Sequence, residues 1–263
     1  MSELLDKVIA AVLSCKEIMF APFAVYEKEG ISNIVTTADK AVEEHLKKAL
    51  LTILSDAGFL GEEGDSVDGN GYCFVVDPID GTANFARGLN ASVVSVGLTK
   101  DGKDCLGVVY NPYTNELYYA ESGKGAFLNG EPIHVSDRDF AHSLYYTAFS
   151  LYRKEFKDSC MNILKEVYAE CDDFRREGSA ALEICRLASG KGELYFEFRV
   201  FPWDSCAAEI ILREAGGFSC HLYSENSDAT QPFPIVAANT KENFERLKAI
   251  VKKEVKALPE NYF

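Results

Sequence analysis

Asp77 and Asp80 lie three residues apart in the segment VVDPIDGTANF, residues 75–85, at the end of an apolar run. Pro78 fixes its own φ angle and favours an extended conformation for Asp77. The two carboxylates could therefore point at one ligand, while the Ile79 carbonyl is left free to coordinate. Two negative charges this close repel each other unless a cation lies between them, and oxygen ligands alone indicate Mg2+ or another hard divalent ion. In the structural alternative, Asp77 ends a strand and Asp80 is an ordinary turn residue.

Gly81 and Thr82 follow directly and could bind an anion beside that cation. A glycine lets the backbone approach a ligand closely. The threonine brings a hydroxyl and a backbone amide at or near the start of a helix, where anions bind well. The segment as a whole therefore predicts a cation and a phosphate side by side.

Two further acidic clusters could join this segment. Glu62 and Glu63 lie in the loop FLGEEG, before the strand that leads to Asp77, and Asp204 follows the tripeptide FPW. Each cluster has a structural explanation of its own, because loop glutamates are usually solvated and Asp204 is a good N-cap for a helix that ends at Gly216-Gly217. The presence of all three clusters together favours a shared metal site.

These segments resemble the inositol monophosphatase family, whose members are magnesium-dependent, lithium-sensitive phosphatases. The matching segments occur in the family's order and span most of the chain from residue 30 to residue 217. They are VTTAD (35–39), LGEEG (60–64), DPIDGTANF (77–85), GSAA (178–181), YFE (195–197), WD (203–204) and EAGG (214–217). DPIDGT followed at this distance by WD and AGG is a specific pattern, so the resemblance predicts a phosphomonoester hydrolase.

The resemblance implies two or three Mg2+ ions, with Mn2+ as a possible substitute. Glu62 and Asp77, with the Ile79 carbonyl, would hold the ion that activates water. Asp77 would bridge to a second ion held by Asp80 and Asp204. Paired ions of this kind can activate the attacking water on one side and stabilise the leaving oxygen on the other.

Three residues beside these ligands take supporting roles by the same resemblance. Glu63 would act in the outer shell or contribute to a third metal ion. Thr82 would orient the attacking water and, with Gly81, offer backbone amides to the phosphate. Asp39 would be the acidic partner of Thr82, although Thr36 and Asp39 also have the spacing of a capping box ahead of a helix.

The substrate contacts implied by the resemblance come from the second half of the chain. Glu197 lies seven residues before Asp204, as does the family glutamate that binds an inositol hydroxyl, and Asp204 itself would also contact the substrate. Ala180 matches a position whose backbone touches the substrate ring, and Ser179 opens the same helix, where an anion or hydroxyl could bind. In the structural alternative, Glu197 is an outward-facing strand residue.

The substrate itself stays open at this stage. Myo-inositol 1-phosphate or a similar polyol or sugar phosphate is the first expectation, and histidinol phosphate, fructose 1,6-bisphosphate or a 3′-phosphoadenosine nucleotide is the alternative. A non-enzymatic regulator that binds metal or phosphate is a third possibility. Ala83, and Gly64 after Glu63, depart from the residues common in the family, and Arg175 and Arg176 could meet a second phosphate or pair with neighbouring acids.

Charge and composition limit the partners of the protein. The 263 residues include 27 basic and 41 acidic side chains, and the resulting net charge of −14 disfavours nucleic acid and anionic lipid as partners. The N-terminal 20 residues contain charged positions and lack a signal-peptide pattern, and no stretch is long and apolar enough to span a membrane. We therefore expect a cytoplasmic protein with eight free cysteines, and the resemblance implies a homodimer.

The elements that must position these residues follow from hydrophobic patterning and turn residues. The pattern predicts helices over 40–54, 158–170, 179–188, 205–215 and 241–258, and strands over 72–77, 92–99, 105–120 (a hairpin around 111–115), 143–149, 193–198 and 234–239. This mixture indicates a layered α/β or α+β fold, and the resemblance implies an αβαβα five-layer sandwich. We expect one unit over 1–263 with two intimate halves, an α+β metal-binding half (1–139) and an α/β half (140–263).

Overall fold

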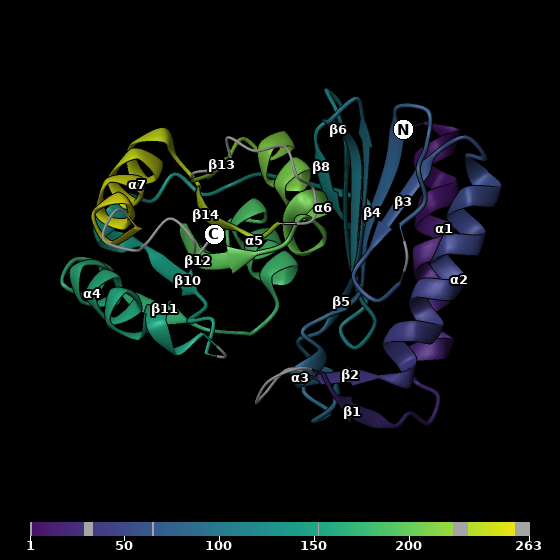
Figure 1. Ribbon diagram of the computed structural model, residues 1–263. Coiled ribbons are helices and arrows are strands. Elements are labelled where there is room, and N and C mark those ends of the chain that lie inside the picture. Colours follow the sequence, from purple (N-terminus) through teal and green to yellow (C-terminus); the bar gives the residue numbers. More distant parts are fainter. Residues whose placement is uncertain (1, 29–33, 65, 152, 223–230, 256–263) are drawn as a thin grey trace.

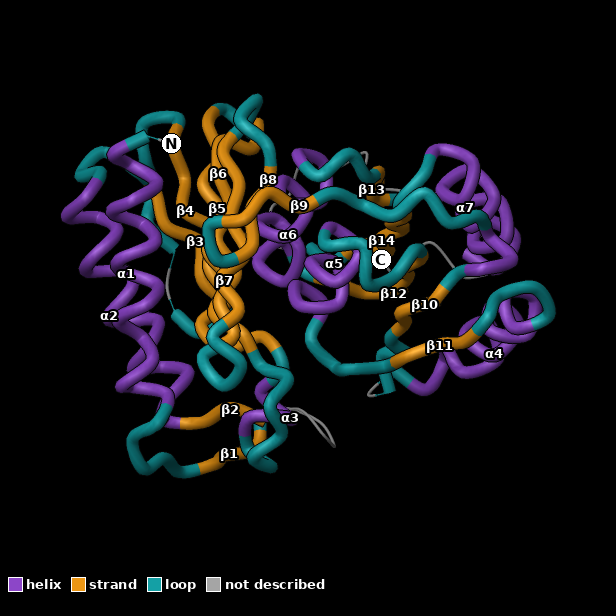
Figure 2. The backbone as a smooth tube through the Cα atoms, turned by 180° about the vertical axis from the view of Figure 1, so that it is seen from behind, coloured by secondary structure: helices purple, strands orange, loops and turns teal. Residues whose placement is uncertain are grey.

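The fold consists of two β-sheets separated and flanked by pairs of helices, which confirms the expected five-layer arrangement (Figure 1). The computed structural model describes residues 2–28, 34–64, 66–151, 153–222 and 231–255. From one side to the other, the layers are α1 and α2, a seven-stranded sheet, α5 and α6, a five-stranded sheet, and α4 and α7 (Figures 1 and 2). The helices of these layers are α1 (Glu3–Met19), α2 (Thr37–Ile53), α4 (Lys157–Tyr168), α5 (Ala180–Ala188), α6 (Pro202–Glu214) and α7 (Lys241–Val255).

The seven-stranded sheet follows chain order from β3 to β9, and every pairing in it is antiparallel except that of β3 with β4. Short turns suffice for antiparallel neighbours, which explains why this sheet is built from consecutive segments. Its strands are β3 (Gly58–Gly61), β4 (Tyr72–Asp80), β5 (Val93–Lys100), β6 (Lys103–Asn111), β7 (Glu116–Glu121), β8 (Ala126–Leu128) and β9 (Glu131–Ile133).

The five-stranded sheet has the order β11-β10-β12-β14-β13 and mixes parallel and antiparallel pairs. Parallel neighbours need crossover connections, and α4 and α5 supply them between β10, β11 and β12. Its strands are β10 (Leu144–Thr147), β11 (Asp173–Arg175), β12 (Leu194–Val200), β13 (Phe218–His221) and β14 (Phe233–Ala238). The division into halves at 139 and 140 stays a prediction.

The middle layer brings the second half of the chain against the first sheet. Helix α6 packs on β5 and β6, and glycines on those strands permit the close approach. A Cβ atom on Gly97 would lie 2.6 Å from the Cys206 sulfur, and one on Gly107 would collide with the Ala207 carbonyl. The outer helices α1 and α2 instead bury larger side chains such as Leu5, Leu46 and Leu50.

Several predicted boundaries differ from the observed ones. Helix α6 begins at Pro202, so Asp204 lies in the first turn rather than at the N-cap, because proline is favoured as a first helical residue. Strand β4 continues through Asp80, with a register shift against β5 between Asp77 and Asp80, instead of ending in a turn. Of the predicted helix over 241–258, residues 256–258 lie outside the described residues.

A strand pair and a single helical turn complete the region near the end of strand β4. Strands β1 (Val25–Glu27) and β2 (Ile34–Thr36) form an antiparallel pair, and α3 (Thr82–Phe85) is a single helical turn.

Within the described ranges, no helix has the length and apolar character needed to cross a membrane.

Replacing Gly107 by alanine should destabilise the protein by about 1–3 kcal/mol, because the added methyl group overlaps the α6 backbone. Urea unfolding monitored by circular dichroism would measure the change. Lys103→Ala, at an exposed position of the same strand, is the control and should stay within about 0.5 kcal/mol of the parent. An unfolding midpoint for Gly107→Ala equal to that of the control would contradict the close packing.

Candidate active site

Asp77 and Asp80 lie at the end of β4 and are almost completely buried. Asp77 is 2% exposed and Asp80 is 8% exposed. The register shift after Asp77 is a bulge in strand β4. Within this bulge, the Oδ1 atom of Asp77 accepts the Ile79 N–H at 3.0 Å. The Ile79 side chain is fully buried in the core, so only its peptide group faces the polar neighbours.

Asp80 joins the end of β4 to the start of α5. Its Oδ2 atom accepts the Ser179 hydroxyl at 2.6 Å and the Ala181 N–H at 2.7 Å. Burial raises the pKa of Asp80 to about 6, although these hydrogen bonds act to lower it. A residue of the first half therefore depends on two groups of the second half for its position.

Four carboxyl groups from three segments share this region, with Asp77 and Asp80 on the same strand. Burial raises the pKa of Asp77 well above its ordinary value, and the negative charges of Glu62, Asp80, Asp204 and Asp39 raise it further. The pKa of Asp204 is raised by burial and then by the charges of Asp80 and Glu62, which places the same groups around it. These mutual effects place the four predicted ligands in one region, and their role as metal ligands stays a prediction.

Asp204 reaches this region from the first turn of α6. Its Oδ2 atom accepts the Phe201 N–H at 2.7 Å, which fixes the carboxyl group against the helix start. Phe201 and Trp203 stack with ring centroids 4.8 Å apart and planes within 3° of parallel. The aromatic pair gives this turn a rigid support next to the acidic residue.

Lys28 is a member of the site that the sequence argument missed. Its ammonium group lies 3.0 Å from Glu62 Oε1 and 2.5 Å from Glu63 Oε1. Glu43, also missed, accepts the Glu63 N–H at 2.8 Å from helix α2. The four-residue spacing of Asp39 and Glu43 could have indicated Glu43, since it places both on one helix face; no pattern in the sequence indicates Lys28.

The donor set fits hard divalent ions by its chemistry. Every predicted ligand presents oxygen, and the raised pKa values of Asp77 and Asp204 reflect negative charge that a cation would compensate. As the side chains stand, no group of three or more His, Cys, Asp or Glu residues among those described is arranged to hold an ion. Ion binding would therefore involve rotation of carboxyl groups, including Glu62, which is paired with Lys28.

Thr82 and Asp39 form the predicted pair. The Thr82 hydroxyl lies 3.0 Å from Asp39 Oδ1 and 3.0 Å from the Ile79 carbonyl oxygen. Asp39 also closes the capping box of α2, since its Oδ2 accepts the Thr36 N–H at 2.8 Å. The capping role of Asp39, which was the structural alternative, is thus confirmed, and Asp39 also contacts Thr82.

Gly81 has a backbone conformation that favours glycine. Its φ angle is +88°, and a Cβ atom there would lie 2.9 Å from the Ala91 carbonyl oxygen and 3.2 Å from that of Gly178. The Ser92 hydroxyl donates to the Gly81 carbonyl at 3.0 Å. The backbone here is enclosed by two other segments, which keeps the amides of this turn in place.

Ser179, Ala180 and Glu197 line the side contributed by the second half. Ser179 is the N-cap of α5, and its hydroxyl is engaged with Asp80 while accepting the Leu182 N–H. Glu197 Oε2 accepts the Tyr195 hydroxyl at 2.9 Å. Burial raises the pKa of Glu197 to about 7, with the Asp80 charge adding to the rise. Glu197 therefore faces the acidic cluster, and its contact with substrate stays a prediction.

The two arginines before Ser179 differ in their surroundings. Arg175 forms an ion pair with Asp173 and donates to the Phe174 carbonyl. Arg176 is exposed, and its positive charge acts on Glu197 by lowering the pKa of that carboxyl. Arg175 therefore pairs with a neighbouring acid, which is one of the two alternatives for these arginines, and Arg176 lies nearer the candidate site.

The metal-free protein should lose stability as the pH rises from about 4 to about 7. Carboxyl groups with raised folded-state pKa values stabilise the fold while protonated, and this contribution disappears as the pH passes the folded-state values of about 6 for Asp80 and about 7 for Glu197. Mg2+ should reverse the loss at neutral pH by binding the folded state. Thermal unfolding in chelator and in Mg2+ would measure this, with NaCl of equal ionic strength as control; equal melting temperatures at neutral pH would oppose ion binding.

Known proteins resemble this chain in sequence and in fold. The model of the inositol monophosphatase family matches residues 3–256. The chain is 36% identical to the Nus factor SuhB of Vibrio cholerae, over 81% of this chain and 80% of that protein. It is 37% identical to a fructose-1,6-bisphosphatase/inositol-1-monophosphatase of Aquifex aeolicus, over 73% of each. An inositol monophosphatase structure from Anabaena superposes with a TM-score of 0.82 at 30% identity, covering 97% of this chain and 98% of that one. The chain belongs to the inositol monophosphatase family.

Proposed function

We propose that the protein is a Mg2+-dependent phosphomonoester hydrolase that releases inorganic phosphate from myo-inositol 1-phosphate or a similar polyol or sugar phosphate. The observation that carries the proposal is the burial of Asp77 and Asp80 at the end of one strand, 2% and 8% exposed, where the charges of Glu62 and Asp204 add to the rise in the pKa of Asp77. Acidic side chains gathered from three segments in this way destabilise a fold unless they bind protons or cations. Family membership supports assigning a phosphatase activity to this cluster.

The residues of the chain divide the chemistry between them. When bound, Mg2+ would polarise the phosphate and lower the pKa of the attacking water. The Thr82 hydroxyl donates toward Asp39, so the lone pairs of its oxygen can accept a hydrogen bond from that water and orient it. The enclosed backbone at Gly81 and Thr82 would donate N–H groups to the phosphate oxygens. Glu197 would accept a hydrogen bond from a hydroxyl group of the polyol.

Two alternatives have specific support. The name of the Aquifex aeolicus relative joins fructose-1,6-bisphosphatase and inositol-1-monophosphatase, which supports fructose 1,6-bisphosphate as an alternative substrate of the same chemistry. Histidinol phosphate and 3′-phosphoadenosine nucleotides stay alternatives through the family resemblance alone. The Vibrio cholerae relative is named a Nus factor, which keeps a non-enzymatic regulatory role as a second candidate. Direct contact with nucleic acid is disfavoured by the net charge of −14.

Substitution of Asp77 by asparagine should reduce Mg2+-dependent phosphate release by about 10²-fold or more, because it removes the charge that the other three carboxylates surround. Release of inorganic phosphate from myo-inositol 1-phosphate, with and without chelator, is the measurement. Asp68→Asn, an exposed acid on a neighbouring loop, is the matched control and should leave turnover unchanged. Full turnover in chelator would exclude the metal mechanism.

A panel of esters distinguishes the candidate functions. We expect kcat/KM for myo-inositol 1-phosphate to exceed the values for histidinol phosphate, fructose 1,6-bisphosphate and 3′-phosphoadenosine 5′-phosphate. A higher value for any of these would replace the first substrate and keep the reaction. Failure of the folded, Mg2+-loaded protein to hydrolyse any of the esters would favour the regulatory candidate.

Lithium should inhibit the reaction, because a small monovalent ion can replace a weakly held Mg2+ that has few protein ligands. Turnover of myo-inositol 1-phosphate in Li+ and in equal Na+ would test this. Unchanged turnover at about millimolar Li+ would argue against a weakly held ion.

The same proposal includes a cytoplasmic homodimer. All eight cysteines lie in the described part of the chain and none forms a disulfide, as expected in a reducing compartment. Family resemblance supports the dimer, and size-exclusion chromatography with light scattering would establish the oligomeric state.

A further inference from the structure

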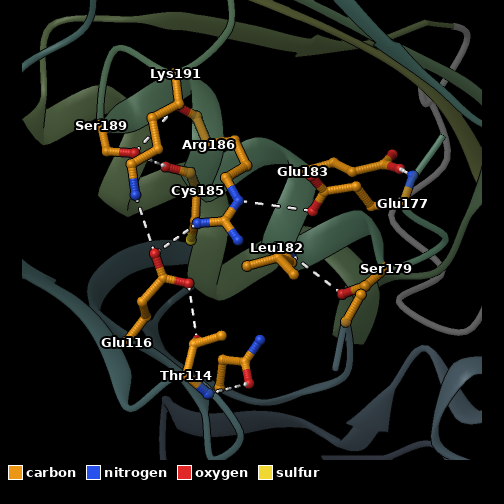
Figure 3. Close-up of polar contacts among 12 residues, drawn as sticks. Thr114, Glu116, Glu177, Ser179, Leu182, Glu183, Cys185, Arg186, Ser189 and Lys191 are labelled. Carbon is orange, nitrogen blue, oxygen red and sulfur yellow. Dashed lines mark hydrogen bonds and ion pairs between the residues drawn. The ribbon is translucent and has the colours of Figure 1, made fainter. Parts of the chain in front are cut away.

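The segment Glu177–Ser179, which leads into α5, is held in place by side chains outside the predicted ligand set. Glu183 Oε1 accepts both the Glu177 N–H and the Gly178 N–H, the latter at 2.9 Å (Figure 3). From the other side, the Asn84 amide donates to the Glu177 carbonyl at 2.7 Å. Gly178 has a φ angle of +84°, so the turn uses a conformation that needs such support.

Glu183 occupies a buried position on α5, where a carboxyl group contributes little to apolar packing. It is completely buried in α5, and its other oxygen, Oε2, has no hydrogen-bond partner among the described residues. Burial raises its pKa well above the ordinary value. A buried carboxyl group costs stability unless its hydrogen bonds compensate, and the bonds that this one makes go to the turn before α5.

Arg186, one helical turn later, fixes the Glu177 side chain to the first sheet. Its guanidinium forms an ion pair with Glu177 across 3.6 Å and donates to Glu116 Oε1 at 2.7 Å (Figure 3). It also donates to the Tyr118 hydroxyl at 2.9 Å. Although burial acts to raise it, hydrogen bonds from Arg186 and Lys191 lower the pKa of Glu116 to about 2. Strand β7, helix α5 and Glu177 are therefore joined through a partly buried cation.

The segment held in this way forms one wall of the candidate site. Ser179 donates to Asp80, and the Gly178 carbonyl oxygen lies 3.2 Å from the position that a Cβ atom of Gly81 would take. A shift of the segment would therefore move a partner of Asp80 and alter the enclosure of the Gly81 backbone. A displacement of about 1 Å at such positions would misalign the groups that bind the phosphate ester and weaken its binding.

We propose that Glu183 and Arg186 are positioning residues that hold Glu177–Ser179 against Gly81 and Asp80, and so set the affinity for the phosphate ester. The inference rests on the proposed phosphatase function. Neither residue touches substrate in this scheme; both act through the backbone of the turn.

Kinetics of four variants on myo-inositol 1-phosphate test the proposal. Glu183→Leu removes the acceptor for two N–H groups and should raise KM about tenfold, while Glu183→Gln keeps an acceptor oxygen and should retain nearly the parent KM. Arg186→Met should also raise KM about tenfold. Arg213→Met is the matched control, because Arg213 joins α6 to Asp104 on β6 in the same manner away from the site, and its KM should stay unchanged.

The split between KM and kcat separates positioning from loss of fold, since partial unfolding lowers the apparent kcat and leaves KM unchanged. Hydrogen–deuterium exchange of the protein without substrate supplies a second measurement. Peptides covering residues 177–179 should exchange faster in Glu183→Leu than in Glu183→Gln, with α7 unchanged as the reference. Unchanged KM and unchanged local exchange in Glu183→Leu and Arg186→Met would overturn the proposal. Absence of activity in the parent protein would instead overturn the proposed function, and the exchange comparison would still report on the turn.

Discussion

Repulsion among buried carboxyl groups is the constraint on which the organisation of this protein depends. Asp77 is 2% exposed and has acidic neighbours from the β3 loop, from its own strand and from α6. Charges of one sign are brought this close only when surrounding structure holds them and protons or cations compensate them. The bulge in β4, the start of α5 and the first turn of α6 each hold one of the aspartates by hydrogen bonds to backbone N–H groups.

The site is assembled from both halves of the chain, and this explains the layer order. The two central helices begin next to the end of β4, so their first turns deliver Ser179 and Asp204 to the same place. Glycines on β5 and β6 let α6 approach the sheet closely enough for this. The fold thus places helix starts, with their free N–H groups, around a cluster of negative charge.

Much of this could be predicted from the sequence, for identifiable reasons. Helix α2 has apolar residues at Val42, Leu46 and Leu50 and a capping box, so the helical period and the N-terminal cap both predict a helix here. The first helix, α1, was not predicted, and β11 and β13 are too short for a clear pattern. The four predicted acidic ligands fall in recognisable motifs, and their role as ligands stays a prediction. Lys28 and Arg186 could not be found in this way, because their partners are distant in sequence and depend on tertiary packing alone.

The contact of α6 with Gly97 and Gly107 has a consequence for the modularity of the chain. A helix from the second half covers an apolar face of the first sheet, and its backbone and the Cys206 and Ile210 side chains pack directly on the two glycines. Polypeptides separated between the halves would each expose a surface shaped only for the other, and each would be prone to aggregate. The two halves would therefore need to be made as one polypeptide for this face of the sheet to be covered.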